Sequence, residues 1–456
     1  MQQKADEPSG EATRTDPRAG NWLAACREVT DLVFGPPNDR HFAIRYWNTG
    51  VIETGSTGSP SFTLVLEHPG ALRRMLLLPS QLHLAEGYVY GDFDIEGDLG
   101  SASRVAAVVR ERLAAPGALL HLMRLVLTLP VSHQHRADAR RALGLAHQAP
   151  LHSADRDAAA VRAHYDVGNE FYELFLDERM VYSCAYYETG AETLEAAQVA
   201  KFEHVCRKLR LLPGERLLDI GCGWGGLIMH AAAHYGVSAT GITLSPAQAK
   251  LASVRIAAAG LSDRCRVELR DYRAASDEPP FDKVASIGMA EHVGEAQLSA
   301  YFQHAWRLTR PGGLFLNHCI TKDRADPRTV AKLLTWREGD FTKRYVFPDG
   351  ELVPLDVLIR AGLAAGFETR DVESLREHYA RTLREWVRRL EAAEAKATAL
   401  VGPQLYRIWR LHMAGGAASF ASGRLTIHQV LYARRDEAGA VPGLPWSRSD
   451  LYRGVP

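Results

Sequence analysis

The sequence shows no excess of charge of either sign. Its 456 residues include 54 Lys and Arg against 54 Asp and Glu, which gives a formal net charge of zero at pH 7. Proteins that bind nucleic acid usually carry a basic excess, so the composition gives no general electrostatic reason to expect nucleic acid as a partner. A charged partner would have to be bound by a local patch.

Cysteine is also scarce. The six cysteines contain no CxxC pair and no spacing typical of a zinc site; they are Cys26, Cys184, Cys206, Cys222, Cys265 and Cys319. A chain of this length does not need a disulfide framework, so we expect free thiols in a reducing compartment and no metal site.

Long apolar runs are missing as well. No run reaches the roughly 18 apolar residues that a membrane-spanning helix needs. The nearest, "GALLHLMRLVLTLP" (117–130), is interrupted by His121 and Arg124. Residues 1–20 are polar, contain Pro and Gly, and lack the apolar core of a signal peptide. We therefore expect a disordered tail over 1–20 and a cytoplasmic protein whose contact with membranes is peripheral.

Residues 21–129 mix two kinds of hydrophobic pattern. The segments "SFTLVLEH" (61–68) and "RRMLLLP" (73–79) predict antiparallel strands, whereas "ASRVAAVVRERLAA" (102–115) and "ALLHLMRLVLTL" (118–129) predict helices. These patterns favour a small α+β domain. The following residues, 130–157, carry little apolar periodicity and are interpreted as a linker.

Strands and helices alternate from residue 158 to residue 456. The strand-like "ERLLDIG" (215–221) precedes the helix-like "WGGLIMHAAAHYG" (224–236), and strand patterns recur in "VSATGITLS", "CRVELRD", "FDKVASIGM" and "LFLNHCI". This alternation predicts an α/β fold with a mostly parallel, doubly wound, Rossmann-like sheet. Open sheets of this kind bind ligands beyond the carboxyl ends of their strands.

A glycine-rich turn follows the first of these strands, in "LLDIGCGWGG" (217–226). Gly221 and Gly223 permit positive φ angles and a close approach of a ligand to the backbone. The spacing is a poor match to the dinucleotide fingerprint, and the Gly-Lys-Ser/Thr of a phosphate-binding loop is missing. Asp219 would repel a pyrophosphate but suits a ligand with ammonium and sulfonium charge. The D-x-G-x-G pattern resembles motif I of class I S-adenosylmethionine (SAM) methyltransferases.

The next two strands end in residues that fit the same cofactor. Thr243 and Gln248 follow the second strand, where a group facing the ribose and adenine is expected. Asp271 and Tyr272 follow the third, where a hydrogen bond and a stacking ring could bracket the adenine. Their order and spacing favour SAM over a tight packing turn in another type of α/β enzyme.

Four further stretches carry a resemblance to a known family. They are "HYDVGNEFYELFLD" (164–177), "YSCAYYE" (182–188), "GMAEHVG" (288–294) and "KRYVFPDG" (343–350). Together with the two cofactor motifs they resemble the cyclopropane-fatty-acyl-phospholipid synthases, a family that includes the mycolic acid cyclopropane synthases and related fatty-acyl methyltransferases. The likeness is dense over 161–350. It implies a SAM-dependent catalytic domain over 158–456 that ends in a helical acyl-binding region.

The resemblance also implies a reaction and a set of site residues. In the family, a methyl group passes from SAM to the double bond of a phospholipid acyl chain, and loss of a proton closes a cyclopropane ring. The implied base is a bound bicarbonate, and by motif position its binding residues are Cys184, Glu291, His318, Ile320 and Tyr345. The "YSCAYYE" stretch likewise implies that Tyr182 and Ser183 contact the cofactor. Glu291 and His318 follow two predicted strands, at the edge where such sites form.

One position departs from the family pattern. Gly416, in "AGGAASF", stands where the bacterial cyclopropane synthases have a cysteine. The ending "IHQVLYARR" also resembles relatives that install methylene or methyl branches on acyl chains. A branched product therefore remains an alternative to the ring. A methyltransferase of a soluble small molecule and a non-catalytic lipid-binding protein are further alternatives.

A phospholipid substrate requires docking to a membrane. Residues 101–150 contain seven arginines against Glu111 and Asp138; they are Arg104, Arg110, Arg112, Arg124, Arg136, Arg140 and Arg141. Near an anionic surface each basic residue contributes roughly 1 kcal/mol. We expect this cluster and the adjacent apolar helix to attach the 21–129 domain to anionic membranes, and the resemblance suggests a homodimer.

Overall fold

The computed structural model describes residues 19–47, 52–53, 60–77, 80–131, 153, 156, 164, 167–277, 279–322, 340–441 and 443–452. The chain divides into two compact units, one within residues 1–135 and the other within residues 136–456. This boundary falls inside the segment 130–157 that the sequence suggested as a linker, most of which lies outside the described residues, as do residues 1–18 of the predicted tail.

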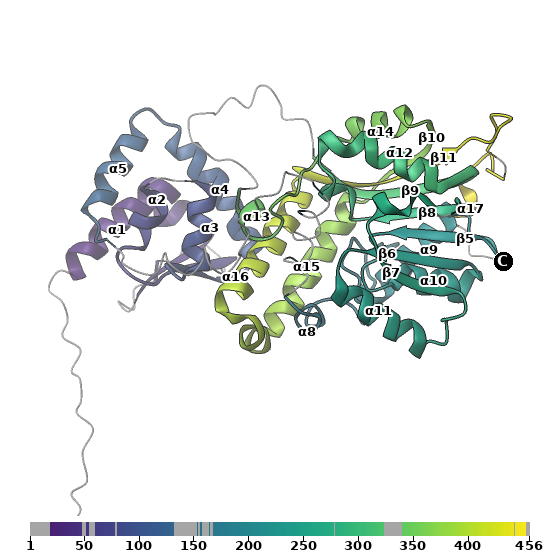
Figure 1. The fold of residues 1–456 in the computed structure, drawn as a ribbon. Coiled ribbons are helices and arrows are strands. Elements are labelled where there is room, and N and C mark those ends of the chain that lie inside the picture. The colour runs from purple at the N-terminus through teal and green to yellow at the C-terminus, as the bar shows by residue number, and fades with distance from the viewer. Residues whose placement is uncertain are drawn as a thin grey trace, which may run out of the picture. The chain divides into compact units, whose positions relative to one another are not determined.

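The first unit combines four strands with five helices among its described residues (Figure 1). Its sheet has the order β2-β1-β3-β4, formed by β1 (Ala43–Tyr46), β2 (Ile52–Glu53), β3 (Phe62–Leu66) and β4 (Phe93–Gly97). Its helices are α1 (Ala19–Phe34), α2 (Ala71–Leu76), α3 (Gln81–Val89), α4 (Leu99–Leu113) and α5 (Ala118–Thr128). The helices predicted over 102–115 and 118–129 are confirmed as α4 and α5.

The predictions for the strands of this unit were only partly right. β3 pairs antiparallel with β4 but parallel with β1. Residues 73–76 of "RRMLLLP" belong to helix α2 instead of a strand, and residues 78–79 lie outside the described residues. Leu72, Met75 and Leu76 in α2 are buried, which is the i, i+3, i+4 spacing of a helix face. The run was too short for its period to be recognised from sequence.

The second unit contains the predicted α/β sheet. Its strand order is β10-β11-β9-β8-β5-β6-β7. The strands are β5 (Arg216–Ile220), β6 (Ser238–Thr243), β7 (Cys265–Leu269), β8 (Phe281–Ile287), β9 (Thr309–Lys322), β10 (Phe367–Ser374) and β11 (Leu425–Arg434). β5 to β9 are joined by parallel pairs, and β11 runs antiparallel to both β9 and β10. β6 pairs with one side of β5 and β8 with the other. The direction in which strands are added to the sheet therefore reverses at β5, and open α/β sheets bind ligands at such a switch point.

Helices cover both faces of this sheet (Figure 1). One face is covered by α9 (Leu194–Leu209), α10 (Gly226–Tyr235) and α11 (Pro246–Ala258), and the other by α12 (Leu298–Leu308) and α14 (Leu355–Ala364). Two buried apolar clusters fill these layers. Short helices α8 (Asn169–Tyr172), α13 (Asp340–Tyr345) and α17 (Ser449–Tyr452) lie in the connections.

The ends of these helices follow from local sequence. Thr193 caps α9 by accepting a hydrogen bond from the Ala196 amide at 3.3 Å, and Ser245 with Pro246 begins α11. These caps fix the points at which the loops before α9 and α11 end and the helices begin.

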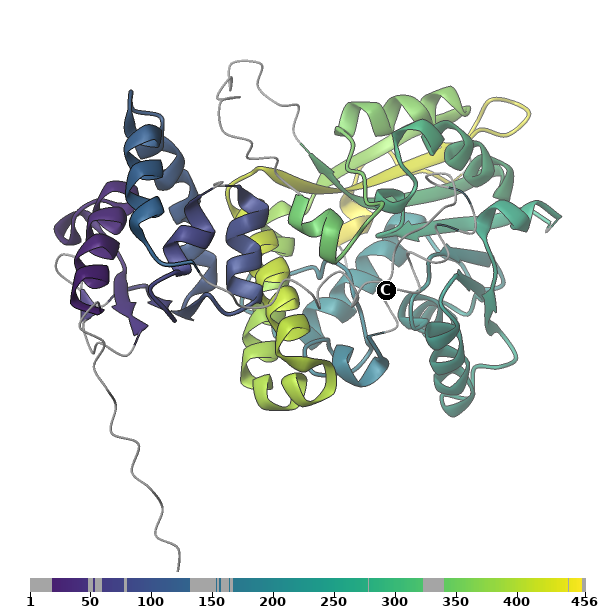
Figure 2. The same cartoon turned by 60° about the vertical axis from the view of Figure 1, so that its left-hand side comes forward.

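A helical pair follows β10 and forms a third cluster. α15 (Arg376–Ala392) and α16 (Glu394–Ala421) lie side by side in both views (Figures 1 and 2). α16 is broken at Gly402, which has a φ of 81° directly before Pro403. This cluster, called the aromatic cluster below, contains Phe171, Tyr172, Phe175, Cys184, Trp224, Trp386, Trp409 and Phe420 among its buried residues.

Candidate active site

The glycine turn lies where β5 meets α10. Gly221 has a φ of 82° and Gly223 a φ of 54°, so both adopt a conformation that favours glycine. The amides of Gly221 and Cys222 donate to the carbonyl of Ile242 at 3.0 Å, which ties the turn to β6. A Cβ added at Gly223 would meet nothing within 4 Å. The turn therefore leaves room for a ligand beside the backbone.

A cavity lies at the carboxyl ends of β5, β6 and β8, and most of the predicted cofactor residues surround it. Tyr182, Ser183, Asp219, Gly221, Gly223, Thr243, Gln248 and Tyr272 all line its wall. Asp271 is the exception. Its carboxylate accepts hydrogen bonds from the backbone and guanidinium of Arg273, at 2.6–2.9 Å. The ion pair directs Asp271 toward Arg273, and Arg270 and Arg273 line the cavity instead.

Asp219 is the cavity's buried acid. It is 3% exposed, and its Oδ1 has no hydrogen-bond partner among the described residues. Burial raises the pKa of Asp219 to about 7, and the charge of Lys201 opposes that rise. A buried polar atom without a partner is costly. The cationic ammonium and sulfonium groups of SAM would supply the missing contact, so the residues present fit this cofactor.

Thr243 and Gln248 are fixed by each other. The Thr243 hydroxyl donates to Gln248 Oε1 at 2.8 Å, and the Ser245 amide donates to Thr243 Oγ1 at 3.2 Å. Both side chains are buried. Both residues line the cavity, so this contact fixes two polar side chains in its wall.

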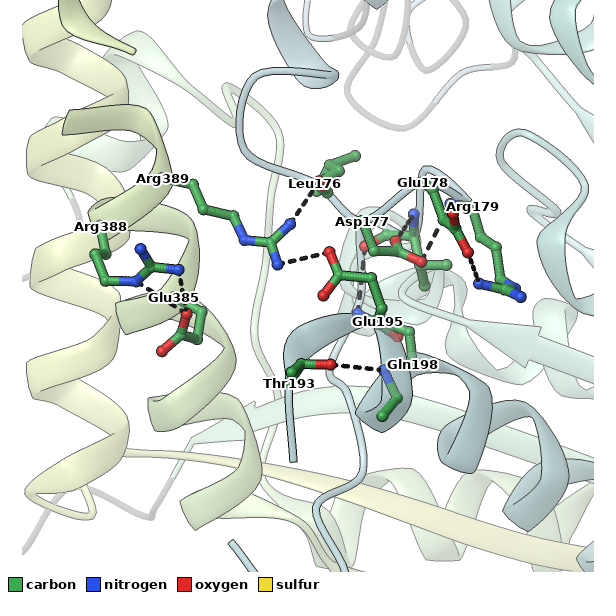
Figure 3. A network of polar contacts seen from close by, with 12 residues as sticks. Leu176, Asp177, Glu178, Arg179, Thr193, Glu195, Gln198, Glu385, Arg388 and Arg389 are labelled. Carbon is green, nitrogen blue, oxygen red and sulfur yellow. Dashed lines mark hydrogen bonds and ion pairs between the residues drawn. The ribbon is translucent and has the colours of Figure 1, made fainter. Parts of the chain in front are cut away.

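The loop that carries Tyr182 and Ser183 is held by buried polar contacts (Figure 3). The Asp177 carboxylate accepts hydrogen bonds from the amides of Arg179 and Val181, at 3.2 and 2.8 Å. Met180, between them, has a φ of 58°, a conformation that is unusual for a residue with a side chain. Arg389 of α15 donates to the Leu176 carbonyl at 3.1 Å and pairs with Glu195 of α9 at 2.6 Å. The loop is therefore anchored to two helices.

Glu291 lies in the short turn Ala290–His292 that follows β8. Its Oε1 accepts a hydrogen bond from the Ile320 amide at 2.7 Å. Its Oε2 is buried and has no partner among the described residues. Burial raises the pKa of Glu291 to about 7, against the lowering effect of the Ile320 hydrogen bond. The side chain can therefore exchange a proton near neutral pH.

His318 lies within β9, two residues before Ile320, and not at the end of a strand. We expected it to follow its strand, whereas β9 continues to Lys322 because β11 pairs with it as far as that residue. The Gln429 amide approaches His318 Nδ1 at 3.4 Å, while Nε2 is buried without a partner among the described residues. Burial lowers the pKa of His318 well below its usual value, as do the charges of Lys201 and Lys208. The ring is therefore neutral.

The three remaining predicted catalytic residues lie in two parts of the second unit. Cys184 and Ile320 both belong to the aromatic cluster. The Cys184 thiol donates to the Ala185 carbonyl at 3.2 Å, and burial raises its pKa, so only its backbone suits an anion. Tyr345 ends α13, and its ring lies 5.2 Å from that of Phe341. It is not part of the aromatic cluster, and its role remains a prediction.

Sequence reasoning missed two residues that the fold places here. Lys201 lines the cavity, and Tyr379 of α15 packs against the aromatic cluster with Cys184 and Ile320. Lys201 shares a helix face with the buried Leu194, Ala197, Gln198 and Val205. A lysine on the apolar face of an amphipathic helix was the available signal. For Tyr379, the signal was its spacing from Leu383 and Trp386 on one face of α15.

Comparisons with known proteins agree with this geometry. Residues 152–430 match the family described as mycolic acid cyclopropane synthetase. A probable fatty acid methyltransferase of Pseudomonas putida is 41% identical over 410 residues, which cover 90% of this chain and 96% of that protein. The cyclopropane-fatty-acyl-phospholipid synthase of Escherichia coli is 34% identical over 289 residues, covering 63% and 71%.

Among solved structures, the mycolic acid cyclopropane synthase CmaA1 complexed with SAH and CTAB superimposes with a TM-score of 0.56 at 35% identity. The match covers 60% of this chain and 98% of that one. The predicted class I methyltransferase fold, the enzyme class and SAM as cofactor are confirmed by these likenesses. The chain belongs to the mycolic acid cyclopropane synthetase family of SAM-dependent methyltransferases.

Proposed function

We propose that this protein transfers a one-carbon unit from SAM to the double bond of an unsaturated acyl chain in a membrane phospholipid and forms a cyclopropane ring. SAM, when bound, supplies an electrophilic methyl group. Asp219, Ser183 and the glycine turn would hold it in the cavity. The similarity to a fatty acid methyltransferase along 90% of the chain supports an acyl substrate.

The observation that carries the proposal is two buried polar atoms without partners, one of them on a residue whose neighbours line the cofactor cavity. Glu291 Oε2 and His318 Nε2 are buried without a partner among the described residues, and Met289 and His292, next to Glu291, line the cavity. The Gln429 amide nitrogen lies 3.4 Å from His318 Nδ1; in the tautomer in which this nitrogen donates to Nδ1, Nε2 would carry the hydrogen and act as a donor. A small oxyanion such as bicarbonate would accept that hydrogen bond and share a proton with Glu291. Their role would be to hold the base that removes the proton.

The aromatic cluster supports an apolar substrate next to the cofactor. Tyr182 lines the cavity and also packs against this cluster, where its ring stacks on Trp386 at 5.2 Å. Trp224 likewise belongs to both. An acyl chain reaching the methyl group would therefore pass apolar side chains, whereas a soluble polar substrate would find few partners there.

Gly416 bears on the choice between a ring and a branch. It lies in α16, and a Cβ added there would meet Leu383 Cδ1 of α15 at 3.2 Å. The helices are thus packed closely at the position where we expected a cysteine. Glu291 and His318 do not depend on this position, so we favour ring closure and keep the methylene- or methyl-branched product as the alternative.

The test is to incubate the purified protein with SAM and vesicles of unsaturated phospholipid and to examine the acyl chains by NMR. We expect the upfield methylene protons of a cyclopropane. Vinylidene protons would establish the branching alternative, which mass alone cannot separate because both products gain CH₂. Vesicles of saturated phospholipid are the control. Absence of any modified lipid, with turnover of a soluble acceptor instead, would overturn the proposal.

We also propose that helix α5 docks the first unit to an anionic membrane. Leu120 and Leu127 are 59% and 54% exposed, and Arg124 lies between them on the same face. An exposed stripe of leucine and arginine suits the lipid headgroup region. Among the described residues, no helix combines the length and apolar character needed to cross a bilayer.

One of the other arginines is already engaged within the first unit. Arg112 donates to the carbonyls of Leu32 and Asp31, at 3.0 and 3.3 Å, and so holds α1. The side chains of Arg104 and Arg110, and all of Arg136, Arg140 and Arg141, lie outside the described residues. The docking proposal therefore depends on α5.

A further inference from the structure

Lys201 is a buried cation in the wall of the cofactor cavity. It lies in the middle of α9, it is 2% exposed, and it lines the cavity together with Ser183 and Asp219. Lysine is almost never fully buried unless it is paired. A second buried lysine on this helix, Lys208, is paired with Asp371 and Glu373 and does not line the cavity.

The groups that face Lys201 come from four elements. Its Nζ lies 3.1 Å from the hydroxyl oxygen of Ser183 and 4.4 Å from the centre of the Phe202 ring. Burial lowers the pKa of Lys201, whereas the carboxylates of Asp177 and Asp219 and the thiols of Cys184 and Cys206 raise it. The charge of Lys201 in turn lowers the pKa of His318 in β9. Among the described residues, no carboxylate lies within ion-pair distance of Lys201, and the Ser183 hydroxyl is its hydrogen-bond partner.

This contact fixes the direction of the Ser183 hydroxyl. An ammonium has three donors and no acceptor, so in its charged form Lys201 must donate and Ser183 Oγ must accept. The Ser183 hydrogen is then free to point elsewhere, and the residue lines the cavity. A hydroxyl held in this way, with a cation behind it, selects a negatively charged acceptor. The only anionic group of SAM is the carboxylate of its amino-acid end.

We propose that Lys201 is a positioning residue of the cofactor site, which holds the Ser183 hydroxyl as a donor toward the carboxylate of SAM and offsets the negative charge of Asp219. The inference rests on the placement of the cofactor in this cavity. Lys201 acts through Ser183, so its contribution appears in cofactor affinity more than in the chemical step.

The proposal has a signature in the pH dependence of binding. Burial lowers the pKa of Lys201 to about 8, against the raising effects of Asp177 and Asp219. The lysine therefore loses its proton as the pH rises through 8, and a neutral amine can accept the Ser183 hydrogen and turn it away from the cavity. Cofactor affinity should fall between pH 7 and pH 9.5. The amino group of the ligand titrates in the same way whichever variant is used. A difference in pH dependence between variants therefore comes from the protein and not from the ligand.

The test is calorimetric titration of the full-length protein with S-adenosylhomocysteine, which keeps the carboxylate but lacks the sulfonium charge. We expect Lys201→Met and Ser183→Ala each to weaken binding about tenfold at pH 7, and the double variant to be no more than about twofold weaker than either. Lys208→Met, which removes a buried lysine from the same helix, should stay within about twofold of the wild type. Circular dichroism confirms that each variant is folded.

Two outcomes would overturn the proposal. One is unchanged affinity of Lys201→Met at every pH, and the other is a double variant about 100-fold weaker, which would show that the two residues act independently. Should Lys201→Met fail to fold, the pH dependence of binding tests the proposal instead. A loss of affinity at alkaline pH in the wild type but not in Ser183→Ala would support it, and the same loss in both proteins would overturn it. Failure of the wild type itself to bind would instead overturn the cofactor site.

Discussion

At the scale of single residues, buried polar atoms without partners mark both halves of the site. Asp219 lines the cofactor cavity and its Oδ1 has no partner among the described residues. Glu291 Oε2 and His318 Nε2 also lack partners there, and Met289 and His292, on either side of Glu291 in the chain, line the same cavity. Burial raises the pKa of both acids to about 7. Pairs of titratable groups with such shifts are typical of catalytic sites. In the proposed function the two acids have different roles, because Asp219 would face a cationic cofactor and Glu291 an anion.

Glu291→Gln should reduce turnover far more than cofactor binding. The amide keeps the shape of the side chain and can accept from the Ile320 amide, but it cannot exchange a proton. General acid–base groups contribute about 10²–10⁴-fold, so we expect turnover to fall by that range and SAM affinity to change less than about threefold. Steady-state kinetics and calorimetry measure the two effects. Glu295→Gln, an exposed acid four residues away, is the control, and a large loss of SAM affinity in Glu291→Gln would contradict the assignment.

SAM binding should weaken as the pH falls below 7. The folded-state pKa of Asp219 is raised to about 7, so the carboxylate that faces the cationic cofactor becomes protonated below that value. Because a single ionised carboxylate would govern this change, we expect the dissociation constant to rise by up to about tenfold per pH unit between pH 7 and pH 5. Asp219→Asn should bind weakly at pH 8 and show no such acid limb. An identical limb in both proteins would assign the titration to another group.

At the scale of elements, the cofactor cavity depends on a loop that is anchored from outside. Arg389 of α15 ties this loop and α9 together through Leu176 and Glu195. Among the described residues, Arg388, the next residue, pairs with Glu385 on the same helix, and its side chain is 65% exposed (Figure 3). The two neighbours therefore form a natural comparison between an anchoring ion pair and a surface one.

Arg389→Ala should lower stability by about 1–2 kcal/mol, because it removes one charged hydrogen bond to a carbonyl and one partly exposed ion pair. For a unit of this size that is a decrease in Tm of about 2–4 °C per kcal/mol. SAM affinity should fall severalfold because the loop carries Tyr182 and Ser183. Arg388→Ala should stay within about 0.5 kcal/mol of the wild type. Thermal unfolding and calorimetry would show whether the two variants differ; equal losses would refute the anchoring role.

The elements also show where sequence patterns were sufficient. In the second unit β5 is followed by a helix that starts after a glycine and β6 by a helix that Ser245 caps, and β5 to β9 were all recognised. "RRMLLLP" was misassigned because four apolar residues in seven positions fit either period. His318 was placed at the wrong point of β9 because the length of that strand is set by pairing with β11, more than 100 residues later in the chain.

At the scale of the whole molecule, the helix proposed to dock to membranes and the cofactor cavity belong to different units. The exposed leucines lie in the first unit, and the SAM cavity lies entirely in the second. A change that weakens membrane attachment should therefore leave cofactor affinity intact. Activity on vesicles and affinity for SAM then become separable measurements.

Leu120→Ser combined with Leu127→Ser should reduce binding to anionic vesicles at least tenfold, since each buried leucine side chain is worth roughly 1.5–3 kcal/mol. Arg124→Glu should weaken binding further and make it less dependent on salt. Vesicle sedimentation measures attachment, and SAM titration is the internal control. Unchanged sedimentation of these variants, or equal binding to neutral and anionic vesicles, would contradict a docking role for α5.

The sequence by itself determined the fold class, the cofactor and the positions that surround it, because these depend on short-range patterns: strand–helix periodicity, a glycine turn and the acid before it. Tertiary structure alone decided which polar atoms lack partners, that Asp271 is directed toward Arg273, and that Lys201 faces Ser183 across the cavity wall. These are properties of contacts between distant segments. Burial, which shifts the pKa values of Asp219, Glu291 and Lys201, exists only after the chain has folded around them.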